Sequence, residues 1–342
     1  MYNHNKTIGV FIIPTGIGCE IGGHAGDATP SARLISGVCD ELIVHPNVVN
    51  ASDINEMTDN MLYVEGSMLD RFLEGKINLR PVKNNKILLV VNPPPHAETI
   101  NAAEAARVTL GIDISISVLD KPLKMNGRIE NDVATGDVSG IEELISHTKK
   151  YEFDALAVAT EIDVPDGVAL NYFRNGGVNP WGGIEAIVSR KISEVLNKPV
   201  AHAPVEDDKT KENEELIKIV YNETVDPRIA PEAISSCYVV SVLKGLHKAP
   251  RVGPGFTVDD IDFLITPLGC VGRPHSACLK KNIPVIVVKE NRTVLHDHIP
   301  DKFIVVENYL EAAGVVAAIK EGISLDTIRR PINKLRLQKN KK

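Results

Sequence analysis

The sequence predicts an α/β fold of mostly parallel sheets covered by helices, arranged as two Rossmann-like halves around a cleft. Short apolar runs rich in valine, isoleucine and leucine recur along the 342 residues. Each run leads into a loop rich in glycine and proline and then into an amphipathic stretch with helical spacing. The runs do not alternate apolar with polar residues, which is typical of strands buried on both faces. Strands that alternate with helices form right-handed βαβ units, and these build a parallel sheet.

The expected elements follow from these runs in chain order. The strands are Ile8–Ile13, Glu41–His45, Lys86–Val91, Asp113–Leu119, Ala155–Ala159, Val200–Ala203, Phe263–Thr266, Val285–Val288 and Phe303–Val306. The helices are Ser31–Val38, Ile100–Leu110, Ile141–Lys149, Ile184–Leu196, Ala233–His247, His275–Lys281 and Tyr309–Glu321. The polar stretch Glu206–Pro227 is expected to be an exposed lid or an insertion. A boundary near residue 150 predicts an N-terminal half (1–150) and a C-terminal half (151–342).

The composition is that of an ordinary globular protein, with 43% hydrophobic and 24% charged residues. The net charge of −7 argues against nucleic-acid and anionic-membrane partners. No apolar run approaches the roughly 18–20 residues that span a bilayer, and the first residues lack a signal-peptide pattern. Five widely spaced cysteines without a CxxC pair predict free thiols in the cytoplasm. A homo-oligomer is expected from the base rate for enzymes of this size, and the basic C-terminal run is expected to be a solvated chain end.

The loop after the first strand carries the densest signal for a binding site. Five glycines occur within eleven residues, and Thr29-Pro30-Ser31 then reads as a helix start. A strand, a glycine loop and a helix N-terminus together predict a site for an anion; the alternative is a loop that merely turns tightly. A dinucleotide site is disfavoured because the helix starts about a dozen residues late and His45 stands where an acidic ribose ligand belongs. The candidate substrate-binding residues here are Thr15, Gly16, Gly18, Gly22, Gly23, His24 and Asp27, with Gly26 completing the loop.

Three further loops follow predicted strands. The first is Asn92-Pro93-Pro94-Pro95-His96, which presents Asn92 as a binding residue and His96 as a base, a ligand or merely a helix cap. The second runs from Asn175 to Gly183. Its Gly182 and Gly183 open a helix that carries Glu185, so these three are candidate binding residues, whereas Trp181 is expected to pack.

The last loop, Thr266–His275, contains Gly269, Cys270 and Arg273. A thiol near a helix N-terminus and beside arginine and histidine is in a setting that lowers its pKa, so Cys270 is a candidate catalytic thiolate; the alternative is a buried, inert thiol. Cys19 stands in the analogous place in the first loop, and His202 ends another strand before Pro204. Because ligands of open α/β sheets bind outside the carboxyl ends of the strands, all these loops are expected to meet at one site.

Several segments of the chain resemble a family known as a domain of unknown function, number 3326. They are IPTGIG-x-x-IGGHAGDATP, VNPPPHAETINAA, NPWGGIEA, KPVAHAP and TPLGC-x-G-x-P-x-x-AC, and they span nearly the whole chain. The resemblance implies no activity, cofactor or catalytic residue. Ile8-Gly-Val-Phe11 and Leu268-Gly-Cys270 also look like motifs of the aspartate/glutamate racemase superfamily. However, that superfamily's first Cys-Asn-Thr motif is absent where Asn92-Pro-Pro-Pro stands, so Cys19 would have to replace its cysteine.

Three functions are therefore compared. The leading hypothesis is an enzyme for a small substrate that bears a carboxylate or phosphate, with Cys270, Cys19, His96 and His202 moving a proton in an isomerase, racemase or lyase and with no cofactor. The second is a metal-dependent hydrolase, in which His24 and Asp27 hold a divalent metal together with other loop histidines. The third is a metabolite-binding regulatory protein without catalysis.

Overall fold

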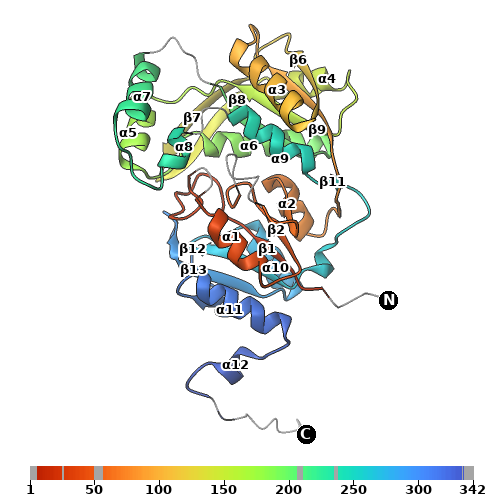
Figure 1. The fold of residues 1–342 in the computed structure, drawn as a ribbon, viewed down its shortest axis with the longest axis vertical. Coiled ribbons are helices and arrows are strands. Elements are labelled where there is room, and N and C mark those ends of the chain that lie inside the picture. The colour runs from red at the N-terminus through yellow and green to blue at the C-terminus, as the bar shows by residue number, and fades with distance from the viewer. Residues whose placement is uncertain are drawn as a thin grey trace.

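The computed structural model describes residues 6–24, 27–49, 57–205, 211–234, 238–332 and 334. Figure 1 shows two α/β lobes, one above the other, each built on a parallel sheet. We call the lobe that holds both ends of the chain the first lobe (residues 6–73 and 256–328), and the lobe inserted between them the second lobe (86–248). The predicted fold class, with mostly parallel sheets flanked by helices, is confirmed.

The first lobe is a doubly wound sheet of six parallel strands. Their spatial order is β3 (Met61–Tyr63), β2 (Glu41–Val44), β1 (Ile8–Phe11), β12 (Phe263–Leu268), β13 (Val285–Arg292) and β14 (Ile304–Val306). Chain order runs outward in both directions from β1 and β12, so the topological switch point lies between these two strands. Ligands bind outside the carboxyl ends of the strands at such a point.

Helices cover both faces of this sheet. α1 (Thr29–Ser36) and α11 (Tyr309–Lys320) pack on one face, and α2 (Gly66–Leu73) and α10 (Arg273–Lys281) pack on the other. The side chains of β1 alternate between the two hydrophobic cores: Phe11 belongs to one, Ile8 and Val10 to the other. Burial on both faces explains why these strands read as continuous apolar runs. The short η2 (Val258–Asp260) precedes β12, and α12 (Leu325–Ile328) follows α11.

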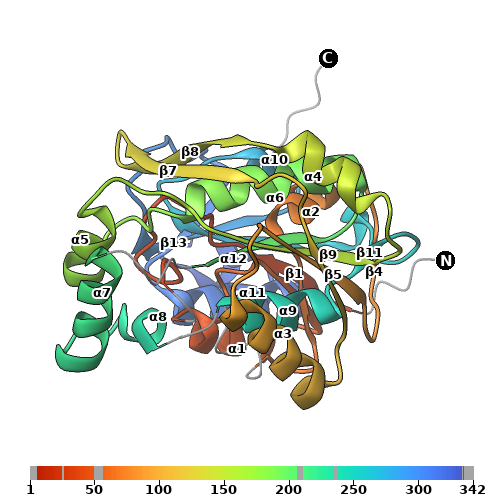
Figure 2. The same ribbon diagram turned by 90° about the horizontal axis from the view of Figure 1, so that it is seen from above.

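The second lobe contains a parallel sheet of four strands in the order β10 (Val200–Pro204), β9 (Ala155–Thr160), β5 (Lys86–Val91) and β6 (Asp113–Val118). Its switch point lies between β5 and β9. α3 (Ala97–Leu110) and α9 (Tyr238–Lys248) cover one face, and α4 (Ile141–Thr148) and α6 (Gly182–Leu196) cover the other, as Figure 2 shows from above.

A hairpin and three helices lie at the edge of the second lobe. β7 (Lys124–Glu130) and β8 (Val133–Ser139) form an antiparallel hairpin. α5 (Val168–Asn175), α7 (Lys211–Asn222) and α8 (Ala230–Ile234) share a small core of their own around Tyr172 and Phe173. Within 206–227, expected to be an exposed lid or an insertion, residues 211–222 form α7, and its Leu216 and Ile219 pack into that core. Residues 206–210 lie outside the described ranges.

Two segments cross between the lobes side by side. β4 (Leu79–Arg80) carries the chain out of the first lobe and β11 (Arg251–Val252) carries it back, and the two strands pair antiparallel. The expected boundary near residue 150 therefore does not separate the sheets, since each sheet draws strands from both sides of it.

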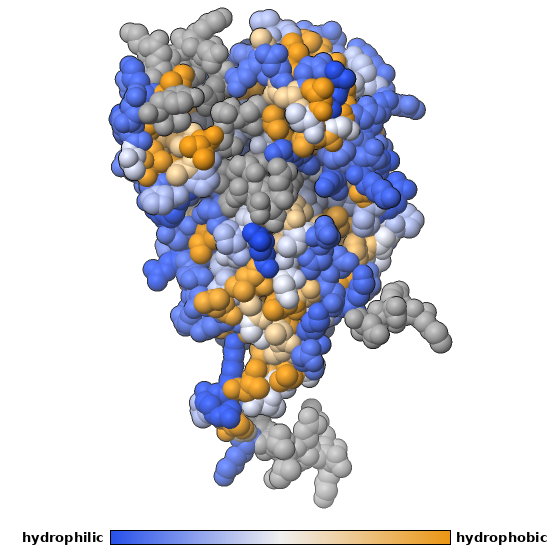
Figure 3. Space-filling model, in the orientation of Figure 1, coloured by the Kyte–Doolittle hydropathy of each residue, from blue (hydrophilic) through white to orange (hydrophobic). Residues whose placement is uncertain are grey.

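Figure 3 shows that hydrophilic residues cover much of one face, while hydrophobic ones gather over the first lobe near α11 and α12. Leu310 of α11 is 72% exposed. None of the described helices is both long and apolar enough to span a bilayer.

Candidate functional site

A cleft of about 1130 Å³ lies between the lobes. Its walls are the segments that follow the carboxyl ends of β1, β2, β3 and β12 in the first lobe and of β9 and β10 in the second, together with the N-terminal half of α6. The carboxyl ends of the strands in both parallel sheets thus face the same cleft. In doubly wound folds, ligands bind at these ends. Of the predicted site residues, the cleft brings together Thr15, Gly16, Gly18, Cys19, Gly22, Gly23, His24, Gly182, Glu185, His202, Cys270 and Arg273.

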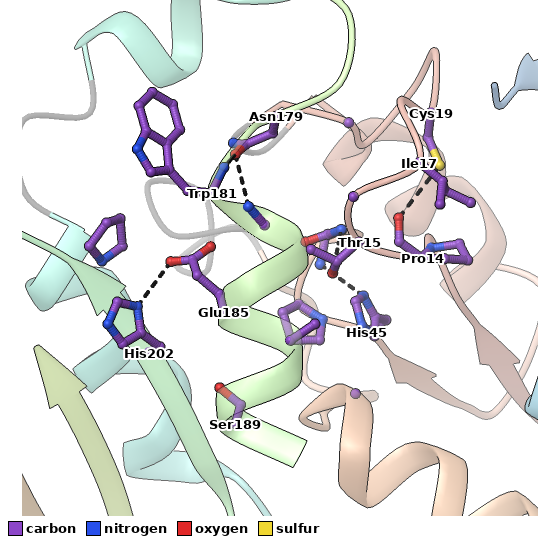
Figure 4. Close-up of a pocket in the computed structure, with 18 of the residues that line it drawn as sticks. Pro14, Thr15, Ile17, Cys19, His45, Asn179, Trp181, Glu185, Ser189 and His202 are labelled. Carbon is purple, nitrogen blue, oxygen red and sulfur yellow. Dashed lines mark hydrogen bonds and ion pairs between the residues drawn. The ribbon is translucent and has the colours of Figure 1, made fainter. Parts of the chain in front are cut away.

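His202 is held rigidly behind a carboxyl group of the cleft. Its Nε2 lies 2.9 Å from Thr160 Oγ1, and its Nδ1 lies 3.2 Å from Glu185 Oε1. The imidazole is fully buried, whereas the Glu185 side chain keeps 23% of its surface exposed. Figure 4 shows Glu185 projecting from α6 toward His202, with Thr15 on the other side of the helix in this view. Of this pair, Glu185 is thus the more exposed side chain, and His202 holds its carboxyl group in place.

A second buried network joins the lobes. His24, from the glycine loop of the first lobe, has its Nδ1 2.6 Å from the Tyr172 hydroxyl on α5. Tyr172 donates a hydrogen bond to Glu232 on α8, and Asn179 Nδ2 donates to the other oxygen of Glu232 at 2.9 Å. Burial and the Glu232 carboxylate raise the pKa of Tyr172 well above its ordinary value. His24, Asn179 and Glu232 all line the cleft.

The glycine loop binds a carboxylate that belongs to the chain itself. Asp27 accepts hydrogen bonds from the backbone N–H groups of Gly22, at 2.6 Å, and of His24. Burial raises the pKa of Asp27 to about 6. Gly22 has a φ of +80°, and a Cβ there would lie 2.2 Å from Ile13, so only glycine suits this turn. The amides of Gly22 and His24, expected to bind a substrate anion, thus already have an anionic partner; Gly26 lies outside the described residues.

The N-terminus of α6 is likewise occupied. Asn179 Oδ1 accepts hydrogen bonds from the N–H groups of Trp181, at 3.0 Å, and Gly182, at 3.1 Å. Gly183 serves close packing, because a Cβ there would lie 2.0 Å from the carbonyl oxygen of Ala134 on the hairpin. Trp181 packs against Tyr172 and Phe173, as expected from the sequence.

The surroundings of Cys270 fit the alternative of a buried, inert thiol better than an activated thiolate. Burial raises the pKa of Cys270 to about 11 and the pKa of Cys19 well above its ordinary value. The neighbours expected to lower these values act elsewhere: His275 lies 2.8 Å from Thr266 Oγ1, and Arg273 points to acidic side chains. Both thiols belong to the hydrophobic core of the first lobe, so they do not face each other from opposite lobes. Gly269, with a φ of +94°, makes the turn before Cys270.

Arg273 contributes to an ionic cluster between the lobes. Its guanidinium donates twice to Glu74 at 2.8 Å and also lies near Asp70, at 3.6 Å, and Glu194, at 3.7 Å. Arg190 of α6 pairs with the same Asp70 at 2.9 Å. The cluster ties α2 and α10 to α6 and neutralises both arginines that line the cleft.

Asn92 and His96 lie outside the cleft. Asn92 exchanges two hydrogen bonds with the backbone of Leu123, which fixes the segment before the hairpin. His96 pairs with Glu161 at 2.9 Å at the switch point of the second sheet, where both side chains are partly exposed. Of this pair only Glu161 lines the cleft.

Sequence reasoning missed several residues of the cleft. Asn179 and Glu232 follow no strand pattern, and Glu65 comes after β3, a strand of three residues that was not expected. Tyr172, which joins Glu232 to His24 behind the cleft wall, was missed as well. The one signal available for Asn179 was its place in the Asn175–Gly183 loop. Among the described residues, no group of three or more His, Cys, Asp or Glu side chains could hold a metal ion.

Fold and cleft together define the class of protein: a two-lobed, doubly wound α/β protein with one binding cleft between its lobes. The chain belongs to the family described as protein of unknown function DUF3326, whose model matches residues 8–329, and this confirms the resemblance in the motifs. An uncharacterized lipoprotein of Synechococcus sp. is 35% identical over 338 residues, which cover 92% of this chain and 91% of that protein. No solved structure matches the chain significantly.

Proposed function

We propose that the protein is an enzyme that transfers protons on a small polar metabolite in the inter-lobe cleft, in a reaction of the isomerase or lyase type. The observation that carries the proposal is the pairing of Glu185 with His202 on the cleft wall, 3.2 Å apart. A carboxylate held by a buried histidine has a fixed orientation and a partner to share its proton, as a general base requires.

The His24–Tyr172–Glu232 network supplies the complementary group. It is buried, it reaches the cleft from the other side of the α6 N-terminus, and its hydrogen bonds allow a proton to pass along it. Glu185 is thus the proposed base, His202 its positioning residue, and His24 the proposed acid. The proposal gives the thiols no part, because burial raises the pKa of both and so disfavours their thiolates.

The charges of the cleft favour a substrate without net negative charge. Nine carboxyl side chains and two guanidinium groups occur among the described residues that line it, and both arginines pair with Asp70. The anionic substrate expected from the glycine loops therefore has less support than an uncharged polar one. A negative field of this kind repels anions and lowers their local concentration.

The test is exchange of substrate hydrogen with solvent. The purified protein is incubated in D₂O with separate panels of polyols and sugars, hydroxy acids, amino acids and phosphate esters, and deuterium uptake is followed by mass spectrometry. Uptake into one panel is expected, it should disappear in Glu185→Gln, and it should persist in Cys270→Ala. Uptake that survives Glu185→Gln, or that vanishes with Cys270→Ala, would overturn the assignment.

A metabolite-binding protein without catalysis is the second candidate. The paired crossings β4 and β11 favour it, because two adjacent connections form a hinge about which lobes can close on a ligand. Saturable binding of a compound that shows no exchange in any panel would support this candidate over the enzyme.

We further propose that the protein works in the cytoplasm as a homo-oligomer. Cys19, Cys39, Cys270 and Cys278 are free thiols, which suits a reducing compartment. The name of the Synechococcus relative supplies the competing prediction of a membrane-attached protein. Cell fractionation, followed by light scattering of the native protein, distinguishes these outcomes.

A further inference from the structure

One arm of the cleft, where β2 and β3 end, contains polar groups that have no partner. Glu65 precedes the first residue of α2 but makes no capping hydrogen bond with its side chain. Glu65 Oε1 and Ser67 Oγ are both buried without a hydrogen-bond partner. Both residues line the cleft, and they are only 7% and 8% exposed. Two unpaired polar atoms in one turn are costly to bury, so a ligand is expected to supply their partners.

The groups in this arm are uncharged at neutral pH. Burial raises the pKa of Glu65 to about 8, so its carboxyl group is protonated, and the Tyr63 hydroxyl donates to the oxygen that is not orphaned. His45, just after β2, is half-buried in the wall of the cleft, and burial lowers its pKa to about 4, which leaves it neutral. The nearest charged residue along α2, Asp70, is paired with Arg190 and Arg273.

We infer that this arm is a subsite for hydroxyl groups of an uncharged polyol or sugar, with Glu65 and Ser67 as its ligand-binding residues. This inference rests on the proposed function and names the substrate class of the same cleft. A carboxylic acid and a serine hydroxyl each offer one donor and one acceptor, as does each hydroxyl of a diol. A phosphate or carboxylate would find no free cation in this arm, and an ammonium group would find no carboxylate to pair with.

Calorimetric titration of the purified protein with ribose, xylitol and myo-inositol tests the inference, with ribose 5-phosphate and glucosamine as charged counterparts. The uncharged compounds should bind more tightly than the charged ones. Glu65→Met and Ser67→Ala should each weaken that binding by about tenfold, the usual effect of one lost buried hydrogen bond. Glu65→Gln should retain it, because an amide also offers a donor and an acceptor. Glu143→Met and Ser146→Ala, on exposed positions of α4, are the matched controls.

Tighter binding of the phosphate or the amine, or unchanged binding in both Ser67→Ala and Glu65→Met, would overturn the inference. Loss of binding in Glu65→Gln would show that Glu65 acts as a carboxylate and would overturn it equally. Thermal unfolding of each variant shows whether the fold is retained. Glu185→Gln separates the two proposals: it should bind polyols like the wild type while losing deuterium exchange. Polyol binding without deuterium exchange would refute only the proposed enzyme activity. Deuterium exchange on another class of compound would refute only the proposed polyol subsite.

Discussion

The two switch points of this protein occupy the same topological position but carry different chemistry. In the first lobe, β1 and β12 lead into Cys19 and Cys270, which are buried in a hydrophobic core. In the second lobe, β9 leads into Glu161 and contributes Thr160 to the His202–Glu185 pair. The comparison teaches that position at a switch point does not create a reactive group. Desolvation raises the pKa values of the thiols, whereas the carboxyl groups of the second lobe have hydrogen-bonded histidine partners.

The sharpest way to break this comparison is to remove the proposed base. Glu185→Gln should lower deuterium exchange about 1000-fold, within the usual range for a general base. Glu161→Gln is the matched control, because Glu161 also lines the cleft but pairs with the partly exposed His96. The control should stay close to the wild-type rate. His202→Gln should fall between them and shift the pH profile, since His202 positions Glu185. Equal losses in the two glutamate variants would remove the distinction between these carboxyl groups.

The buried Glu65, in the polar arm of the first lobe, should make the stability of the protein depend on pH. Glu65 keeps its proton in the folded state up to about pH 8, whereas the unfolded chain releases it near pH 4.5. Stability from this group is therefore fully present below pH 4.5 and lost as the pH rises towards 8, by about 3 kcal/mol at pH 7. Glu65→Gln should remove that loss. The unfolding temperature of the variant relative to the wild type, measured by calorimetry, should therefore rise between pH 5 and pH 8. Parallel pH profiles for the two proteins would contradict this.

Thiol labelling sharpens the same comparison. The pKa of Cys270, raised to about 11 from 9, lowers its thiolate fraction at neutral pH about 100-fold, and burial slows attack further. Iodoacetamide should therefore label Cys270 and Cys19 of the folded protein at pH 7 far more slowly than the same residues in urea, as mass spectrometry of the peptides would show. Rapid labelling of either cysteine in the folded protein would restore a thiol mechanism.

The smallest expected effect concerns the ionic cluster between the lobes. Arg273→Met should cost about 1 kcal/mol, because the pair with Glu74 is partly exposed and screened by solvent. Arg273 lowers the pKa of Glu74 to about 2, so its contribution is present above pH 4.5 and disappears as the pH falls towards 2. Lys281→Met, which breaks the exposed pair with Asp259, should change the urea midpoint hardly at all. An Arg273→Met midpoint indistinguishable from that control would exclude the cluster as a clamp.

Much of the sheet architecture could be predicted from the sequence. All nine expected strands exist, and Lys86–Val91 matches β5 to the residue. Most are continuously apolar because both faces are buried, whereas β6 is largely exposed. The missed elements lack that signal. β3 has only three residues. In the hairpin of β7 and β8, buried and exposed side chains alternate, and the turn residues Asn131 and Asp132 both have a positive φ. The sequence of α7 is mostly polar, because the helix packs only on a small core and needs few apolar side chains for it.

The candidate site was predictable by region but not by role. The strand ends that line the cleft follow from the parallel topology, so Gly16, His24, Glu185 and His202 were expected near one another. The sequence could not show which polar groups form hydrogen bonds or ion pairs with one another. Asp27 accepts the loop amides, Asn179 caps α6, and Arg273 pairs with Glu74, so three expected anion sites have partners from within the chain. Such pairings depend on contacts between residues far apart along the chain.

The insertion of the second lobe between β3 and β12 has a consequence for synthesis of the chain. β1 pairs with β12, 252 residues from its own end, so the central pair of the first sheet cannot form until some 270 residues have left the ribosome. Until then one edge of β1 has no neighbouring strand, while the second lobe has all of its own strands and can fold. Such a delay exposes an apolar strand edge to other chains. The nascent first lobe is therefore the part of this protein with the greatest need of a chaperone.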